Sequence, residues 1–233
     1  MKYVLSLLLA LSFLVAPAAG HAQVAAGPSI ALPPAEVILN ACKEMGIEAV
    51  DGEYVVSKIP DLINKSGKVF VIDARPARTY DDGFIPTAFN MYDAKFKLIY
   101  PEFEKLDIPK ETEIFIGIGR PCPMSLGDIK QLKVKGFTNL KAFVKGPVFF
   151  ERYFSEVTVK GAKKHVSNGA VVVNLTADAD LSKFLAANVE KDKVIVVVGP
   201  ADKAKVNYAL AEKVYKTGYK KTAVLNGNIN DIR

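Results

Sequence analysis

Short continuous apolar runs separate segments of helical periodicity along most of the chain. The runs occupy residues 69–72, 114–118 and 194–198. Apolar runs without alternation are typical of strands that are buried on both faces of a parallel sheet. After the second run, Leu126, Ile129 and Leu132 mark one face of a helix. This pattern predicts an α/β fold in which mostly parallel sheets are flanked by helices.

The segment before the first run predicts a helix followed by a short strand. From residue 35 the apolar positions recur at helical spacing, and Cys42 lies on the apolar face. We therefore interpret Cys42 as a small buried hydrophobe rather than a reactive thiol. Asp51 and Gly52 predict a turn, which leads into a short strand at residues 54–56 and a short helix near residues 60–64.

The second half of the chain repeats the pattern of the first half. Residues 194–198 with Gly199 match residues 114–118 with Gly119 at an offset of 80, and a helical segment follows each run. The second copy is abbreviated, because about half of the segment between its first two strands is missing. We expect a first unit at residues 35–155 and an abbreviated second unit at residues 168–233, joined by a polar connector.

The first 34 residues predict an export signal and a flexible lead. Lys2 precedes an apolar run, and small residues at Gly20 and Ala22 suit cleavage after Ala22, so residues 1–22 are interpreted as a signal peptide. Pro17 leaves the run shorter than the ~20 apolar residues that a membrane-spanning helix needs. Residues 23–34, rich in Ala, Gly and Pro, predict the lead. We expect a periplasmic or secreted protein without stable membrane insertion after cleavage.

Composition excludes several classes of function. The formal net charge of the 233 residues is only +6, and the lysines are interleaved with acids, as in residues 102–110 and 183–193. Without aromatic residues alternating with these lysines, no nucleic-acid partner is expected. The chain has two Cys and two His, and their spacing matches no metal site. We expect neither a metal nor another cofactor.

Two stretches of the first unit resemble the rhodanese family. Residues 71–76 end a strand with Asp73, Ala74 and Arg75, and Tyr80 and residues 83–90 follow in the order of the family's signature. Residues 114–118, the loop after them and residues 136–140 are similar to the strand, active-site loop and helix end of that family. The resemblance implies two rhodanese-like domains and a sulfurtransferase activity that passes sulfane sulfur through a cysteine persulfide.

The chain departs from the family pattern at the nucleophile. Depending on the family variant used for alignment, the usual catalytic cysteine falls on Gly119 or on Gly117. Cys122 stands three to five residues further along the loop, so it is the candidate nucleophile, and its thiol must be open to a donor. Arg120 is the candidate cation beside it. The family's histidine is replaced by Phe84, and a glycine by Thr87.

Three further residues are predicted to bind at the loop or to support it. Ser125 and Asp128 have the spacing of a capping box, so a helix is expected to begin at Ser125, where unpaired N–H groups favour an anion. Asp73 and Arg75 are expected to pair at the end of the first strand. The expected partners are a small sulfur-containing anion as donor, a thiol as acceptor, and a further protein.

Other functions for this loop were weighed against sulfur transfer. A phosphatase would need an arginine six positions after the cysteine, and that position holds Asp128, so phosphatase chemistry is excluded. A rhodanese-like binding or scaffold module without turnover stays open, because the thiol is displaced and Pro121 and Pro123 remove N–H donors from the loop. A disulfide between Cys42 and Cys122 in an oxidising compartment is a third alternative.

Overall fold

The computed structural model of the chain describes residues 33–146, 149–199 and 204–232. The predicted signal peptide, and all but the end of the predicted lead, lie outside the described residues. Within the described ranges, no helix combines the length and the apolar character that a membrane crossing requires.

The first sheet has five parallel strands in the order β1-β5-β4-β2-β3. In chain order the strands are β1 (Glu48–Asp51), β2 (Val69–Asp73), β3 (Phe89–Asn90), β4 (Glu113–Gly117) and β5 (Leu140–Lys145). The helices between them are α1 (Ala35–Glu44), α2 (Gly52–Ile63), α3 (Ala77–Asp81), α4 (Phe96–Glu104) and α5 (Pro123–Val134). Short 3-10 helices at Asp93–Lys95 and Phe149–Glu151 complete this half.

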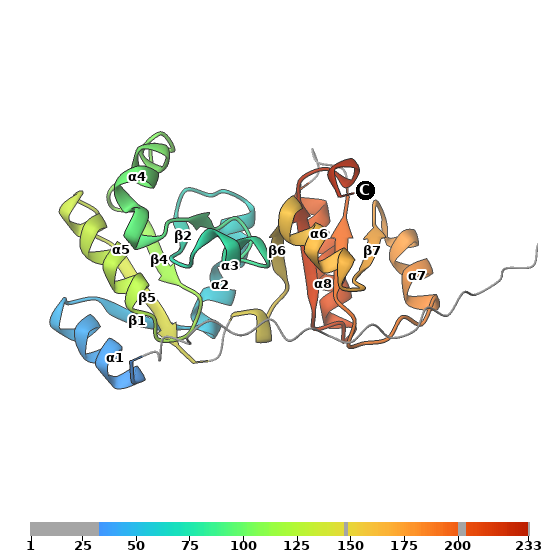
Figure 1. Ribbon diagram of the computed structural model, residues 1–233, viewed down its shortest axis with the longest axis horizontal. Coiled ribbons are helices and arrows are strands. Elements are labelled where there is room, and N and C mark those ends of the chain that lie inside the picture. Colours follow the sequence, from blue (N-terminus) through green and yellow to red (C-terminus); the bar gives the residue numbers. More distant parts are fainter. Residues whose placement is uncertain (1–32, 147–148, 200–203, 233) are drawn as a thin grey trace, which may run out of the picture. The chain divides into compact units, whose positions relative to one another are not determined.

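The central strand β4 shows why a continuous apolar run was needed. Ile114 and Ile116 point to the face that α1, α4 and α5 cover, whereas Phe115 points to the opposite face, against α2. Figure 1 shows these helices on the two sides of the sheet. All three side chains are fully buried. Burial on both faces is what the sequence predicted for this run.

The second sheet has four parallel strands in the order β6-β9-β8-β7. Its strands are β6 (Ser155–Thr158), β7 (Val171–Asn174), β8 (Ile195–Val198) and β9 (Thr222–Asn226). Its helices are α6 (Val159–Ser167), α7 (Asp178–Ala186) and α8 (Ala204–Lys216), with a 3-10 helix at Ile229–Asp231. The predicted α/β fold with mostly parallel sheets is confirmed.

Two local predictions need correction or extension. Residues 54–56 are helical, because the Asp51 side chain accepts a hydrogen bond from the Tyr54 N–H at 2.9 Å and so caps α2; the strand precedes this cap. The expected polar connector contains strand β6, which belongs to the second sheet, and helix α6. An isolated antiparallel bridge between Phe84 and Glu156 links β6 to the first half of the chain.

Candidate functional site

The loop after β4 positions Cys122 at the start of α5. Gly117 and Gly119 turn the chain with φ values of 125° and 103°, both in the left-handed region. Cys122 then adopts an extended backbone, φ −144° and ψ 120°, as the residue before the first helical one. Such an N-cap residue lies beside the unpaired N–H groups of the first helical turn. The thiol is therefore placed where an anion is favoured.

The predicted capping box is wrong. The helix begins at Pro123, whose fixed φ suits the first helical position, so Ser125 and Asp128 already belong to the helix. Both side chains are fully buried. The Ser125 hydroxyl and both Asp128 carboxyl oxygens have no hydrogen-bond partner among the described residues.

A cavity of about 30 Å³ lies at the carboxyl edge of the first sheet, and all five predicted site residues line it. Asp73 and Arg75 come from the end of β2, and Arg120, Cys122 and Ser125 from the loop and first turn after β4. Parallel strands β2 and β4 are neighbours, so their carboxyl ends meet at this edge. The cavity has about the volume that one water molecule takes up in the liquid.

The predicted pair of Asp73 and Arg75 is confirmed. The Arg75 Nη2 and Nε donate to the Asp73 carboxylate at 2.6 Å and 2.9 Å, and Nη2 also donates to the Gly83 carbonyl at 2.6 Å. Both side chains are almost completely buried. The Asn90 side chain donates to the Asp73 and Arg75 carbonyls at 3.0 Å and 2.7 Å. These bonds fix the guanidinium beside the cavity.

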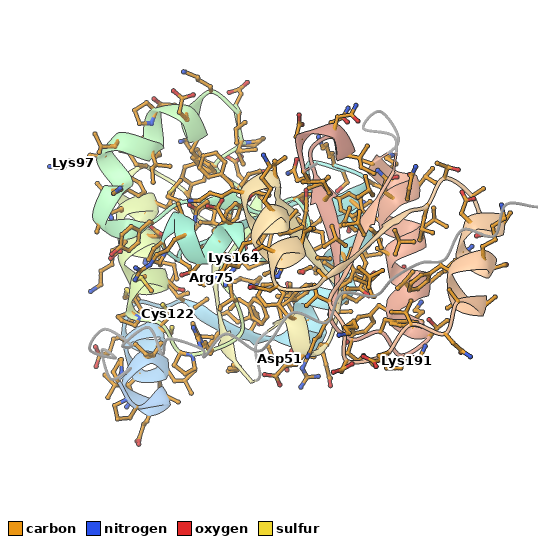
Figure 2. The ribbon with its side chains drawn as sticks, turned by 45° about the vertical axis from the view of Figure 1, so that its right-hand side comes forward. Asp51, Arg75, Lys97, Cys122, Lys164 and Lys191 are labelled. Carbon is orange, nitrogen blue, oxygen red and sulfur yellow. The ribbon has the colours of Figure 1, made fainter. Side chains whose placement is uncertain are left out.

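The Cys122 thiol, predicted to be open to a donor, is almost completely buried. The residue is only 6% exposed, and it lines the small cavity together with Arg75; both residues are labelled in Figure 2. Cys42 is 1% exposed in the core, and burial raises the pKa of its thiol. Both cysteines are free, so the structure lacks the disulfide considered above.

Asp128 is a buried carboxyl group inside α5 rather than a capping group. Burial, followed by the nearby carboxylates of Asp93 and Asp73, raises the pKa of Asp128 to about 9. The carboxyl is therefore neutral at pH 7. Its helical spacing from Ser125 and Leu132 places it on a buried face, and this spacing was the sequence signal that could have revealed it.

A second cavity, of about 340 Å³, shares Arg75 with the first. Lys220, Lys221 and His165 also line it, together with one acidic residue, Asp82. The His165 ring Nε2 lies 2.7 Å from the Asp82 carbonyl oxygen. The excess of basic groups suits an anion larger than the first cavity can hold.

No family model and no curated relative matches the chain. Solved structures match it with low scores. The rhodanese-like domain of the Alr3790 protein from Anabaena sp. is 21% identical over 42% of this chain and 67% of that one, with a TM-score of 0.31. The BH2092 protein from Bacillus halodurans is 23% identical over 49% of this chain and 77% of that one, with a TM-score of 0.35.

A longer match is the thiosulfate sulfurtransferase from Pseudomonas aeruginosa, 15% identical, with a TM-score of 0.38. It covers 85% of this chain, which spans 46% of that protein's length. The Anabaena domain carries the name of the family that the sequence motifs resemble. The fold class of this chain rests on its own two parallel sheets.

Replacing Gly117 should destabilise the protein strongly. A Cβ there would lie 2.5 Å from the Phe143 carbonyl oxygen, in addition to the strain of its φ. We expect Gly117→Ala to lower the free energy of unfolding by ~2 kcal/mol or more in urea titrations. Gly46→Ala is the matched control, because Gly46 also has a positive φ but nothing within 4 Å, and it should cost only about 1 kcal/mol. Equal losses of stability in the two variants would contradict a steric clash at residue 117.

The buried Asp128 should make stability fall as the pH rises. Its folded-state pKa lies above the value of 3.8 that it has when unperturbed, so the folded protein retains a proton that the unfolded chain releases. The contribution is fully present below pH 3.8 and is lost as the pH rises towards about 9. We expect Asp128→Asn to flatten this fall and to be more stable than wild type at pH 7, by urea titrations across pH. The control Asp192→Asn, at an exposed site, should change neither the fall of stability with pH nor the stability at pH 7. If wild type and Asp128→Asn lost stability in parallel as the pH rose, the raised pKa of Asp128 would be contradicted.

Proposed function

We propose that the protein is an exported, rhodanese-like sulfurtransferase that carries sulfane sulfur as a persulfide on Cys122. The observation that supports it is the placement of this thiol at the N-cap of α5, on a cavity that Arg75 and Arg120 also line. A helix N-terminus and two guanidinium groups favour the negative charge of a persulfide. Export is inferred from residues 1–22 alone.

The transfer consists of two displacements at sulfur. The Cys122 thiolate attacks the sulfane sulfur of a donor such as thiosulfate, a new S–S bond forms, and sulfite leaves with the electron pair of the broken bond. An acceptor thiolate then attacks the outer sulfur, which leaves as the acceptor's persulfide and regenerates the Cys122 thiolate. Neither displacement needs an added oxidant or reductant.

In this proposal one cavity holds the persulfide and the other binds the donor. The cavity at Cys122 has room for a single added atom, which suits the outer sulfur of the persulfide. The larger basic cavity on the other side of Arg75 has room for a whole donor anion. Arg75 lines both, so its guanidinium is the group that we assign to orient the donor. Pro121 and Pro123 lack N–H groups and cannot donate to the anion. In this proposal the anion is therefore stabilised by the two arginines and by the backbone amides of Met124 and Ser125.

A binding module without turnover is the second candidate. It is favoured by the limited access to the thiol: Cys122 is 6% exposed, and its cavity of about 30 Å³ is too small for a complete donor molecule. In that case the Asp73–Arg75 pair would serve only to hold the loop as part of a surface for a protein partner.

Sulfur loading separates the two candidates. We expect incubation of the full chain with thiosulfate or with inorganic polysulfide to add about 32 Da by intact mass spectrometry. Cyanide should then remove this sulfur as thiocyanate. Cys122→Ser should not gain the mass, whereas Cys42→Ser, the matched control in the core, should gain it like the wild type.

Two outcomes would contradict sulfur transfer at Cys122. One is a wild-type chain whose mass stays unchanged with both donors, which supports the binding module. The other is a gain that persists in Cys122→Ser, which assigns the chemistry to Cys42.

A further inference from the structure

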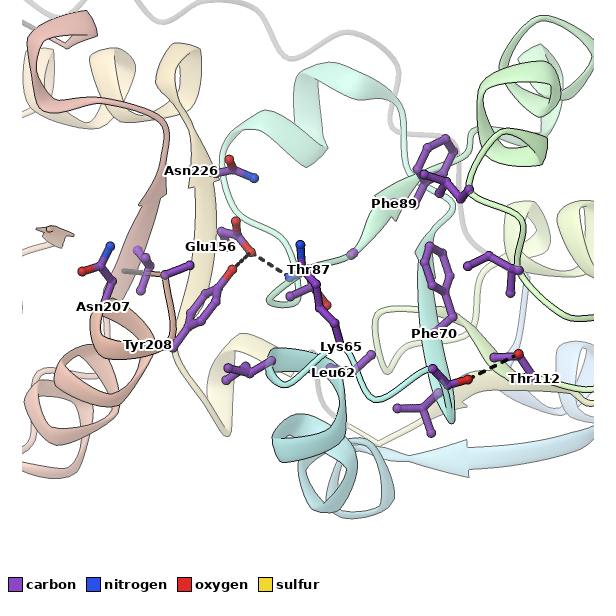
Figure 3. A pocket seen from close by; sticks show the side chains of 18 of the residues that line it. Leu62, Lys65, Phe70, Thr87, Phe89, Thr112, Glu156, Asn207, Tyr208 and Asn226 are labelled. Carbon is purple, nitrogen blue, oxygen red and sulfur yellow. Dashed lines mark hydrogen bonds between the residues drawn. The ribbon is translucent and has the colours of Figure 1, made fainter. Parts of the chain in front are cut away.

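A third cavity lies away from Cys122. It has a volume of about 690 Å³, within the range of about 300–1,000 Å³ that is usual for small-molecule sites. Its walls come from the segments before β2 and β4, from β3, and from the start of α8 and the end of β9 (Figure 3). Cys122 follows the opposite end of β4, and no residue lines both cavities.

One wall of this cavity is apolar and fixed in place. It consists of side chains of Leu62, Val69, Phe70, Phe89, Leu106 and Ile108. Phe70 and Phe89 both pack on Phe103, with ring centroids 5.6 Å and 5.5 Å apart. Leu106 is 45% exposed although it is a large hydrophobic residue. The wall therefore presents apolar surface that a ligand body would cover.

The buried acid of this cavity already has its partners. The Glu156 Oε2 accepts hydrogen bonds from the Thr87 N–H at 2.7 Å and from the Tyr208 hydroxyl at 2.8 Å. Figure 3 shows both bonds converging on one oxygen of the carboxylate. The Asn226 side chain is a further donor to Glu156. The carboxylate thus links β6 to α8 and to the Thr87 turn, and it is not the group that a ligand would satisfy.

Lys65 is the one basic residue among those that line the cavity. It follows α2 with a left-handed backbone, φ 49°, and its N–H donates to the Leu62 carbonyl at 3.0 Å. In Figure 3 its side chain extends between the apolar wall and Glu156. No carboxylate oxygen of a described residue lies within 4.0 Å of its ammonium group. Lys65 and Glu156 are the charged residues of this lining, and they interact electrostatically. Because the Glu156 carboxylate already accepts two hydrogen bonds, Lys65 is the charged group that an added ligand can pair with.

We propose that this cavity binds a small amphiphilic monoanion, an aliphatic or aromatic carboxylate or sulfonate. The apolar body lies against the wall formed by Phe70, Phe89 and Leu106, and the anionic head pairs with Lys65. An amphiphilic cation would face the Lys65 ammonium and a carboxylate that already has its donors. The proposal is independent of sulfur transfer at Cys122.

A fluorescence titration of the full chain with 1-anilinonaphthalene-8-sulfonate tests this site, with decanoate as competitor. We expect saturable binding that decanoate displaces. Lys65→Met should weaken the affinity by roughly fivefold, and the exposed Lys68→Met, outside the cavity, should not. Leu106→Asp should weaken binding more than tenfold, because it removes apolar surface and adds a like charge. Leu98→Asp is its control, at a leucine that is 77% exposed and does not line the cavity.

Several results would overturn the proposal. Unchanged affinity in both Lys65→Met and Leu106→Asp would place the dye elsewhere, and equal losses in the two controls would show non-specific adsorption. Competition by dodecyltrimethylammonium that matches decanoate would contradict the assigned charge. Cys122→Ser should bind the dye like the wild type, so a failure of the sulfur-transfer proposal would leave this result unaffected.

Discussion

The buried ion pair of Asp73 and Arg75 is the interaction on which the carboxyl edge of the first sheet depends. Through it, the end of β2 is tied to the Gly83 carbonyl, and Asn90 adds two bonds to the same backbone. Removing one partner would leave an uncompensated buried charge, which is strongly destabilising. The pair therefore fixes the backbone around it, and both of its members line the cavity at Cys122.

Two glycines after β4 limit the side chains that this turn can hold. A side chain at Gly117 would meet the Phe143 carbonyl oxygen, and one at Gly119 would be strained by a left-handed backbone. These are the two positions at which the resemblance described above would place a catalytic cysteine. Cys122 follows this turn as the N-cap residue of α5, and it lines the same small cavity as Arg75.

Features that depend on local sequence pattern could be predicted, whereas features that depend on packing between distant segments could not. Runs such as 114–118 indicated strands buried on both faces, and the D-x-R spacing indicated the Asp73–Arg75 pair. The same local logic failed at Ser125, because Pro123 begins the helix earlier, and at residues 54–56, because Asp51 caps a helix. The burial of Cys122 arises in the packed structure and could not be inferred from the sequence of its loop.

The cavity that Lys65 and Glu156 line could not be predicted from the sequence either. Lys65 and Glu156 stand far apart in the sequence, and neither belongs to a motif. The Phe84–Glu156 bridge and the hydrogen bond from Thr87 bring Glu156 to the cavity that Lys65 also lines. The repeated α/β pattern predicted two sheets, but it contained no information on the space between their connecting segments.

The most direct test of the account is a crystal structure of the protein after treatment with inorganic polysulfide. If Cys122 carries a persulfide, we expect density for a second sulfur bonded to the Cys122 Sγ, inside the cavity that Arg75 also lines. An unmodified Cys122 thiol with protein atoms filling that cavity, or an added sulfur on Cys42 instead, would contradict it.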